Sequence, residues 1–452
     1  MRMRILWVKM GGLWPATTGG RVRSLNTISE LARGHQVTVI TTHGQGDDPT
    51  GLKQQLARCE RVVSVPYAVP KRGSATFAAS VASSWFSHYP VDLWKWRVPE
   101  VRREVRQALA AGDVDLCVAD FLFAAVNVPM PRRSRARQAS DVPVLLFEHN
   151  VEYLIWQRLA NLEGCRWKRA LFEMEWRKVR ACEAEAIRRA ALTIAVSDDD
   201  RNRLAAISAE SRVVSIATGV NTNYFAPRCD AEVPARLVFS GSMDWHPNED
   251  AVCYFVDAIL PRIRAEFPNL SFTIVGRNPS ARVRELARQP GVHVTGTIDD
   301  VRPSIAEGSV YVVPLRAGSG TRIKIFEALA MAKAVVSTTV GAEGLALESG
   351  RHFLAADTPH DFAHAVIRLL RDPARRQALG SAGRALVEAN YSWATVARQF
   401  EARCEEVVAE HAYAGREAIR GADLSRAGSP RHRGARVVAG EQPAVGWSHH
   451  HS

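Results

Sequence analysis

Short runs rich in valine and isoleucine alternate along this chain with longer segments of helical periodicity. In the first half, the pattern predicts strands at residues 5–10, 35–41, 114–119, 142–148, 192–197 and 212–217. In the second half, it predicts strands at residues 236–241, 270–276, 292–296, 310–315 and 334–338. These runs do not alternate polar with apolar residues, which is typical of strands buried on both faces of a parallel sheet. The sequence therefore predicts an α/β protein with two doubly wound, Rossmann-like domains that face each other across a cleft.

The boundary between the two domains is predicted at Gly219, where a turn and a polar stretch follow the last strand of the first series. The first domain then spans residues 1–218 and the second spans residues 219–391. For residues 392–411 we expect a helix that packs back on the N-terminal domain. Residues 412–452 lose periodicity and are rich in glycine, alanine, arginine, serine and proline, which predicts a disordered tail.

The composition is that of an ordinary globular protein. Hydrophobic residues make up 46% and charged residues 23% of the 452 positions, which excludes a disordered, collagen-like or disulfide-dense chain. No apolar run reaches the roughly 18 residues of a membrane helix, and the short N-terminal run without a cleavage site predicts a strand rather than a signal peptide. The seven scattered cysteines favour reduced thiols and a cytoplasmic protein over a disulfide frame or a zinc site.

The net charge of +12 is concentrated in the first half of the chain. Residues 1–218 carry 32 lysines and arginines against 22 acidic residues, whereas residues 219–411 carry 21 against 22. A basic domain can attract nucleic acid, anionic lipid or a phosphorylated substrate, and it can equally be a solvated surface with surplus arginine. The densest basic run contains Arg132, Arg133, Arg135 and Arg137. This run would be the first contact with an anionic membrane surface.

Two segments of the first half could carry chemistry. Glycine pairs at Gly11-Gly12 and Gly19-Gly20 lie between the first strand and a helix, where they let the backbone approach a ligand and where helix-start N–H groups suit an anion. The loop lacks a GxGxxG pattern and no acidic residue ends the second strand, so an NAD site is not favoured. Glu148, His149 and Asn150 crowd at the carboxyl end of a buried strand, which faces the ligand crevice of a parallel sheet. A tight turn and a structural histidine are the alternatives.

The second half has a denser group of candidates at residues 312–332. A strand there leads into a flexible turn, which contains Gly318, Ser319 and Gly320. A helix begins near Thr321, and Arg322 and Lys324 occupy its first turn, where cations oppose the helix dipole. This placement indicates a strongly anionic ligand such as a diphosphate. Glu327 follows and can accept hydrogen bonds from sugar hydroxyls. The alternative is an ordinary surface helix.

Three further turns after second-half strands can present backbone N–H groups to the same crevice. They contain Gly241 with Ser242, Gly276 with Arg277, and Gly296 with Thr297. The acidic groups of the chain precede a strand or begin a helix, where they have structural explanations. The sequence therefore predicts no metal site.

Together these segments resemble a bacterial group 1, family 4-like glycosyltransferase with the two-domain GT-B fold. The matching stretches are the N-terminal glycine loop, EHN at 148–150, TGVNTNYFAP at 218–227, FSGSMDWHPNEDAV at 239–252, FTIVGR at 272–277, VTGTIDDVRP at 294–303, PLRAGSGTRIKIFEALAMAKAVVST at 314–338 and GAEGL at 341–345. The resemblance spans residues 4–410. It implies a retaining enzyme that transfers a sugar from a nucleoside diphosphate donor to an acceptor hydroxyl, without a metal or another cofactor.

The resemblance also implies a role for each domain and for its candidate residues. The second domain would bind the donor and the first the acceptor, which would be a sugar or a lipid-linked sugar in polysaccharide or glycolipid assembly. The implied catalytic residues are His149, Arg322 and Lys324. The implied donor-binding residues are Gly19, Gly20, Gly241, Ser242, Gly276, Arg277, Thr297, Ser319, Gly320, Thr321 and Glu327. The implied acceptor-binding residues are Gly12, Glu148 and Asn150.

The chain departs from the family pattern in two places. Ser319 stands where the family often has a glutamate that contacts the donor sugar, whereas Glu327 matches a second glutamate that implies ribose contacts. Ser242 and Asn248 stand near positions where the family often has an arginine and a lysine for the diphosphate. Arg322 and Lys324 are the candidates to replace that charge.

The sequence is also compatible with other functions. A nucleotide-sugar epimerase or a glucan phosphorylase could use the same architecture, although no candidate lysine for a pyridoxal phosphate site is present. A nucleic-acid-binding protein would explain the positive charge, but the charge is diffuse and no nucleic-acid motif is present, so we expect no nucleic-acid partner. A peripheral position on the inner face of the plasma membrane is compatible with a cytoplasmic enzyme.

Overall fold

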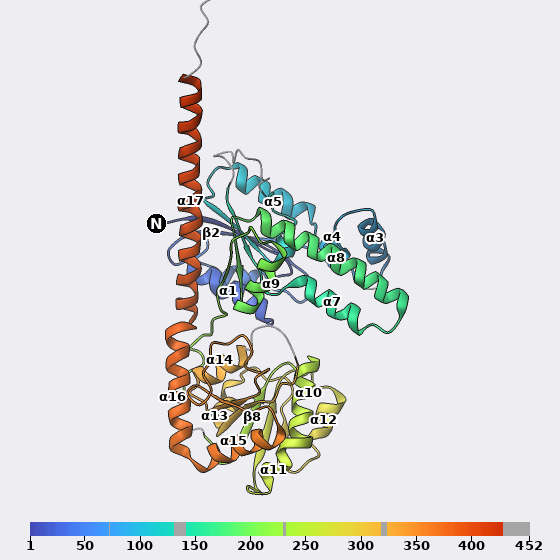
Figure 1. Ribbon diagram of the computed structural model, residues 1–452, viewed down its shortest axis with the longest axis vertical. Coiled ribbons are helices and arrows are strands. Elements are labelled where there is room, and N and C mark those ends of the chain that lie inside the picture. The colour runs from blue at the N-terminus through green and yellow to red at the C-terminus, as the bar shows by residue number, and fades with distance from the viewer. Residues whose placement is uncertain (72, 131–141, 229–231, 318–322, 428–452) are drawn as a thin grey trace, which may run out of the picture.

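The computed structural model describes residues 1–71, 73–130, 142–228, 232–317 and 323–427. The chain forms two α/β domains, drawn one above the other in Figure 1, and each is built on a parallel sheet. The last two helices lie along one side of the molecule. One of them runs beside the lower, C-terminal domain, and the other continues upward beside the N-terminal domain.

The N-terminal domain contains a seven-stranded sheet in the order β3-β2-β1-β4-β5-β6-β7. Its strands are β1 (Arg4–Lys9), β2 (Gln36–His43), β3 (Arg61–Pro66), β4 (Leu116–Asp120), β5 (Val144–Phe147), β6 (Leu192–Ala195) and β7 (Val213–Ser215). Its helices are α1 (Gly19–Leu31), α2 (Pro49–Gln55), α3 (Ala75–Trp85), α4 (Val91–Lys95), α5 (Pro99–Ala110), α6 (Leu122–Ala125), α7 (Glu152–Leu162), α8 (Arg166–Arg189) and α9 (Asp198–Ile207). Alternate side chains of β1 enter separate hydrophobic clusters on the two faces of the sheet, which explains its unbroken apolar run.

The C-terminal domain contains a six-stranded sheet in the order β10-β9-β8-β11-β12-β13. Its strands are β8 (Arg236–Ser240), β9 (Ser271–Val275), β10 (Val292–Val294), β11 (Val310–Val313), β12 (Val335–Ser337) and β13 (Leu354–Ala355). Its helices are α10 (His246–Tyr254), the π-helix η1 (Phe255–Ile259), α11 (Leu260–Arg264), α12 (Ala281–Leu286), α13 (Arg302–Glu307), α14 (Ile323–Ala330), α15 (Pro359–Arg371) and α16 (Pro373–Asn390), followed by α17 (Trp393–Ala427). The predicted fold class, two doubly wound parallel sheets, is therefore confirmed.

The sequence pattern did not predict two edge strands, β3 and β13. Strand β3 has six residues but is mostly half-exposed and ends in a proline, so it lacks the buried run that marked most of the other strands. Strand β13 has only two residues and carries no readable pattern.

The chain crosses between the domains twice, and the two crossings lie side by side. The backbone N–H of Val220 donates to the Tyr391 carbonyl at 2.8 Å, and the N–H of Trp393 donates to the Val220 carbonyl at 3.3 Å. A Cβ on Gly219 would lie 2.6 Å from the Trp393 ring, so only glycine fits where the first crossing passes the second.

Helix α17 packs on the N-terminal domain. Trp393, Val396 and Phe400 belong to the same buried cluster as β1, and the ring of Phe400 lies 5.5 Å from that of Trp7. The helix continues to Ala427, so the predicted disorder is wrong for residues 412–427. The hydrophobic periodicity by which a buried helix is recognised is missing from this segment, so its sequence was read as lacking structure. The rest of the predicted tail, residues 428–452, lies outside the described residues.

Among the described residues, no helix combines the length and the apolar character needed to cross a membrane. The six cysteines in that part of the chain are free thiols.

Candidate active site

The carboxyl edge of the N-terminal sheet carries a row of buried polar side chains. The register pairs Lys9 of β1 with Asp120 of β4, and Asp120 with Phe147 of β5. Lys9 Nζ lies 2.9 Å from Asp120 Oδ1, and Trp7 Nε1 donates to Asp120 Oδ2 at 2.8 Å. His149 lies two residues beyond Phe147, so its side chain emerges on the same side of the sheet. The register thus joins three strand ends in one cluster.

The ring of His149 is fixed by contacts on three sides. Its Nε2 lies 3.0 Å from Asp120 Oδ1, and its ring centroid lies 4.2 Å from that of Phe121 and 4.4 Å from that of Phe147. Burial lowers the pKa of His149 to about 3, against the opposing effect of Asp120 and with a further lowering by Lys9. The imidazole is therefore neutral at pH 7. The Asp120 carboxylate favours the proton on Nε2, which leaves Nδ1 as an acceptor.

Asp120 is ionised although it is completely buried, because its partners stabilise the negative charge. Burial alone would raise its pKa, but Lys9 and His149 hold the pKa of Asp120 well below its usual range. The next residue, Phe121, has φ +79°, a left-handed conformation that costs free energy for a residue with a Cβ. Its ring lies 4.2 Å from Lys9 Nζ. Backbone strain at this point therefore coincides with the buried ion pair.

The N-terminus of α1 lies directly beside His149. A Cβ on Gly20 would lie 3.3 Å from the Phe121 ring and 3.4 Å from His149 Nδ1, so glycine permits the close approach. A Cβ on Gly19 would lie 3.4 Å from Cδ1 of Ile323, the first residue of α14 in the other domain. The start of α1, His149 and the start of α14 therefore lie close together where the two domains face each other.

The loop that contains Gly11 and Gly12 closes around an ion pair between Arg21 and Asp47. Gly12 has φ +78°, and a Cβ there would lie 2.7 Å from Asp47 Oδ2. Asp47 accepts from Arg21 Nη1 at 2.6 Å and from the Gly44 N–H at 2.8 Å. Arg21 also donates to the Gly11 carbonyl at 2.7 Å. The loop closes around Asp47, and Gly12 is required for that closure.

A pocket of about 550 Å³ lies beside this loop, at the carboxyl ends of β1, β2 and β3. Its lining includes the aromatic rings of Tyr67 and Trp96 and the cations Arg21 and Lys71. Aromatic walls with a few placed polar groups are typical of a small-molecule site. Asp47, which also lines the pocket, pairs with Arg21, so Lys71 leaves the lining with a net positive charge that favours a ligand with negative charge.

Glu148 faces away from His149, as expected for neighbours along an extended chain. Burial, together with Glu183 and Glu152, raises the pKa of Glu148 well above its usual range. Glu183 accepts from the backbone N–H groups of Glu152 and Tyr153, at 2.9 and 3.3 Å, and so supports the start of α7. Asn150 is half-buried and contacts Glu152 Oε1 at 3.5 Å. This acid cluster holds the loop in place, and its geometry does not support the predicted acceptor contact of Glu148.

In the C-terminal domain, Lys324 of α14 reaches the carboxyl end of β8. Its Nζ donates to Asn248 Oδ1 at 2.7 Å and lies 4.1 Å from the Phe239 ring centroid. A Cβ on Gly241 would lie 2.7 Å from the same nitrogen. The Lys324 ammonium thus lies beside Asn248. The resemblance leads us to expect a cation near Asn248, because the family often has a lysine or an arginine there.

The turns after β8 and β9 form one rim beside Lys324. Arg277 Nε donates to Ser242 Oγ at 2.9 Å, and the Gly241 N–H donates to the Val275 carbonyl at 2.9 Å. A Cβ on Gly276 would overlap the Gly241 carbonyl oxygen, so no other residue fits there. The rim presents a guanidinium and a hydroxyl near the Lys324 ammonium.

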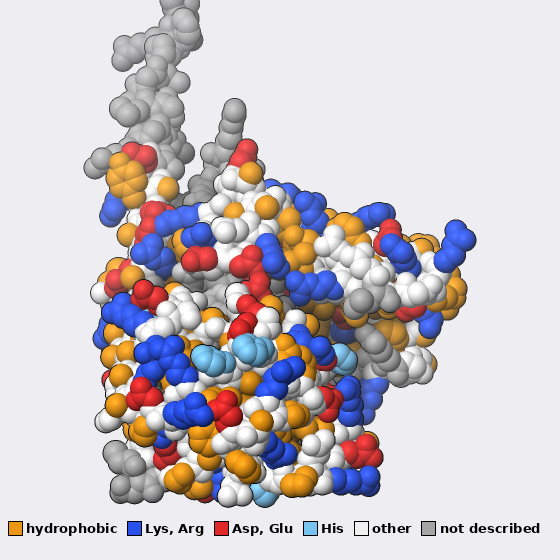
Figure 2. Space-filling view, turned by 60° about the horizontal axis from the view of Figure 1, so that its bottom comes forward, with side chains coloured by type: hydrophobic (Ala, Val, Ile, Leu, Met, Phe, Trp, Pro, Cys, Tyr) orange, Lys and Arg blue, Asp and Glu red, His pale blue; other side chains and the backbone are white. Residues whose placement is uncertain are grey.

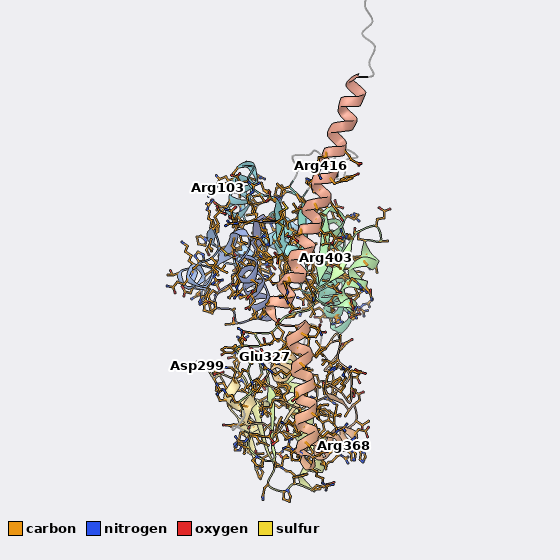
Figure 3. All side chains as sticks on the ribbon, turned by 90° about the vertical axis from the view of Figure 1, so that its left-hand side faces the viewer. Arg103, Asp299, Glu327, Arg368, Arg403 and Arg416 are labelled. Atoms are coloured by element: carbon orange, nitrogen blue, oxygen red, sulfur yellow. The ribbon has the colours of Figure 1, made fainter. Side chains whose placement is uncertain are left out.

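Glu327 lies one helical turn beyond Lys324. Figure 3 shows it at the end of the C-terminal domain that faces the N-terminal domain, whereas Arg368 lies at the opposite end. Burial raises the pKa of Glu327 to about 7, although Lys324 opposes this rise. Near neutral pH a ligand that hydrogen-bonds to the ionised carboxylate must therefore displace a proton.

This pKa gives a prediction for nucleotide binding. If Glu327 holds ribose hydroxyls, donor affinity should fall as the pH drops below about 7, because protonation competes with the ionised acceptor. Glu327→Gln should weaken binding by about tenfold or more and abolish this pH dependence. Calorimetric titration with the intact donor checks both, since its diphosphate does not titrate near neutrality. An unchanged affinity for the variant, with donor and with free nucleoside diphosphate, would contradict the assignment.

Part of the predicted donor site lies outside the described residues, namely Ser319, Gly320, Thr321 and Arg322. The basic run with Arg132, Arg133, Arg135 and Arg137 lies outside them as well. Thr297 is exposed beyond the end of β10. Within the described ranges, no group of three or more His, Cys, Asp or Glu residues is arranged to hold a metal ion.

The sequence reasoning missed Asp120 and Lys9. Each of these two residues lies at the end of a strand that the sequence analysis had located. His149 was selected because it is a polar residue at the carboxyl end of a strand, and the same rule applies to Asp120 and Lys9. Arg23 of α1 was also missed. It is buried and donates from Nε to Thr218 Oγ1 at 2.8 Å, which ties α1 to the first interdomain crossing.

Two facing parallel sheets, with a polar site where their carboxyl edges meet, are the architecture of GT-B glycosyltransferases. The family described as "Glycosyltransferase Family 4" matches residues 18–224, and the one described as "Glycosyl transferases group 1" matches residues 234–372. The chain belongs to these glycosyltransferases. Among solved structures, sucrose-phosphate synthase from Thermosynechococcus elongatus is similar over 90% of this chain and 100% of its own, with a TM-score of 0.64 and 18% identity.

The chain is also similar to a second solved structure and to two curated relatives. Anabaena HepE in complex with UDP and glucose matches 89% of this chain and 100% of its own, with a TM-score of 0.60 and 13% identity. Phosphatidyl-myo-inositol mannosyltransferase of Mycobacterium tuberculosis is 30% identical over 221 residues, 46% of this chain and 57% of that protein. An uncharacterized 44.6 kDa protein in the cps region of Klebsiella pneumoniae is 20% identical over 400 residues, 86% of this chain and 96% of that protein.

Proposed function

We propose that the protein transfers a sugar from a nucleoside diphosphate sugar to an acceptor hydroxyl, with retention of the anomeric configuration. The observation that carries this proposal is the position of Lys324, whose Nζ lies 2.7 Å from Asn248 Oδ1 at the carboxyl end of β8. Glu327 stands one turn away on the same helix. A fixed cation for a diphosphate and a carboxylate for a ribose, side by side, fit a nucleoside diphosphate.

The leaving group is the diphosphate, and the main catalytic task is to stabilise the negative charge that develops on it. Lys324 and Arg277 supply positive charge from the donor domain. The N-terminus of α1, with the N–H groups of Gly19 and Gly20, approaches from the other domain and suits an anion. The closeness of the α1 start to Ile323, whose Cδ1 would lie 3.4 Å from a Cβ on Gly19, supports a diphosphate held between both domains.

His149 orients a substrate hydroxyl in this proposal. Its neutral ring, fixed by Asp120 and two aromatic rings, offers Nδ1 as a hydrogen-bond acceptor beside the start of α1. A pKa of about 3 excludes a resting imidazolium at neutral pH. The hydroxyl of the acceptor then attacks on the face that the diphosphate leaves, with its proton passing to the departing oxygen.

The acceptor would occupy the pocket beside Gly12. The net positive charge of its lining, which Lys71 adds to the Arg21–Asp47 pair, favours an anionic acceptor such as a lipid-linked sugar diphosphate. Such an acceptor would place the enzyme in cytoplasmic polysaccharide or glycolipid assembly. The names of two relatives, a phosphatidyl-myo-inositol mannosyltransferase and a protein of a cps region, support a lipid acceptor and a polysaccharide context.

The test is a panel of nucleotide sugars. We expect slow hydrolysis of one donor, with release of the nucleoside diphosphate, and faster release once an acceptor is supplied. Proton NMR of the glycoside product should show the anomeric configuration of the donor. Inversion would refute retention, and no turnover or binding with any donor would refute the proposed function.

We also expect turnover without a divalent metal, because Lys324 and Arg277 meet the charge of the leaving group. EDTA should change kcat by less than about twofold, whereas loss of a metal that carries the leaving group would cost several kcal/mol. The measurement is initial rate with EDTA and after addition of magnesium or manganese. Activity abolished by EDTA and restored by either metal would contradict the expectation.

A further inference from the structure

One side of the N-terminal domain carries exposed large hydrophobic side chains on adjoining helices. Trp85 and Phe86, at the end of α3, are 55% and 94% exposed. Ile155 and Leu159 of α7 are exposed as well, and Trp167 near the start of α8 is 63% exposed. Of the nine exposed large hydrophobic residues that the structure describes, five therefore lie on this side. Figure 1 shows α3, α7 and α8 projecting from the domain at the right.

Helix α3 has no charged residue with which to face water. Residues 73–90, which contain the helix, include no Asp, Glu, Lys or Arg. A surface helix ordinarily turns a charged face to solvent. The outward side of α3 instead ends in Trp85 and the following Phe86.

Helix α3 and the following helix α4 are each tied to α8 by a hydrogen bond. Lys178 Nζ donates to the carbonyl of Ser84 in α3 at 2.9 Å, and Glu175 Oε2 accepts from the N–H of Val91, the first residue of α4, at 2.8 Å. The apolar end of α3 and the tip of the α7–α8 hairpin project from the same side of the domain (Figure 1). We call them together the docking surface, which comprises α3 with Phe86 and the hairpin tip at residues 155–170.

The hairpin tip is basic as well as apolar. Residues 155–170 contain four cations against one carboxylate, and the cations are Arg158, Arg166, Lys168 and Arg169. All four are exposed. Lys168 Nζ lies 5.6 Å from the Trp167 ring, so charge and aromatic surface are interleaved. Figure 2 shows basic and hydrophobic side chains together on the arm that projects at the right.

We propose that the docking surface binds an anionic lipid membrane. An uncharged helix ending in Trp and Phe suits the boundary between headgroups and acyl chains, where aromatic rings partition favourably. Arginine and lysine beside it suit anionic headgroups. Helix α7 begins two residues after Asn150, so a docked hairpin would bring the loop that contains His149 towards the bilayer. The inference deepens the proposed function, because it supplies the surface from which a lipid-linked acceptor would come.

The test is co-sedimentation with vesicles of phosphatidylcholine alone and of phosphatidylcholine mixed with phosphatidylglycerol, at low and moderate salt and without substrate. We expect binding to the anionic vesicles that weakens with salt. Arg158→Glu with Arg166→Glu and Lys168→Glu should lower the partition coefficient by about tenfold or more. Trp85→Ser with Phe86→Ser should leave a weaker, fully salt-sensitive association.

The controls match each change elsewhere on the surface. Arg288→Glu with Arg351→Glu and Arg368→Glu reverses three exposed charges of the C-terminal domain, and Tyr413→Ser removes an exposed aromatic ring from α17. Neither control should alter vesicle binding, and melting temperatures should show that all variants fold. Three results would overturn the proposal: no binding by the wild type, equal loss in the charge control, or a wild-type dimer that Trp85→Ser with Phe86→Ser dissolves. The vesicle assay contains no substrate, so none of these results would decide whether the protein is a transferase. The nucleotide-sugar panel tests that activity separately.

Discussion

Replacing Lys324 by alanine is expected to lower kcat/KM for the nucleotide-sugar donor by about 10²- to 10³-fold, as for removal of a group that stabilises charge in the transition state. The side chain is fixed between Asn248 and the Phe239 ring, so its ammonium needs little reorganisation when the diphosphate leaves. Initial rates over donor concentration measure the effect. Affinity for the free nucleoside diphosphate should also fall, because a charge-assisted contact is lost.

Two variants separate this effect from a general loss of positive charge. Lys324→Arg keeps the charge but not the compact ammonium, and we expect partial activity. Arg368→Ala removes an exposed cation from the opposite end of the same domain (Figure 3) and should leave kcat/KM unchanged. The assignment of Lys324 fails if Lys324→Ala behaves like Arg368→Ala.

The Asp120→Asn variant should lose both turnover and stability. It leaves the Lys9 ammonium buried without its carboxylate, which costs about 3–5 kcal/mol when one partner of a buried pair is removed. It also removes the group that lies 3.0 Å from His149 Nε2. A ring that no longer holds its orientation should cost about 10²-fold in kcat. Thermal melting and steady-state kinetics measure the two losses separately.

A double variant distinguishes positioning from simple destabilisation. Lys9→Met with Asp120→Asn removes both buried charges, and should recover most of the lost stability. Turnover should stay low, because His149 still lacks its carboxylate partner. Nitrogen NMR of the imidazole should show Nε2 protonated in the wild type and a mixture of tautomers in the double variant. Recovery of wild-type turnover together with stability would refute the positioning role of Asp120.

The local sequence was enough to find the segments of the candidate site. Polar residues at strand ends and glycines before a helix depend on local backbone geometry, which is why His149, Gly20 and Lys324 could be selected. Which of them meet could not be read from the chain. Glu148 and His149 are adjacent in sequence, yet the extended backbone turns Glu148 towards Glu183 and His149 towards α1.

The sequence by itself determined the two parallel sheets, because strands buried on both faces require continuous apolar runs between helices. It did not determine the end of the last helix, since α17 beyond residue 411 has no packing pattern to read. Only the tertiary structure decided that Lys9, Asp120 and His149 form one charge cluster, because the parallel register of β1, β4 and β5 aligns residues more than 100 positions apart in the chain. It also decided that the Lys324 ammonium lies beside Asn248. That contact depends on how α14 packs against the end of β8, and such packing is a property of the folded domain.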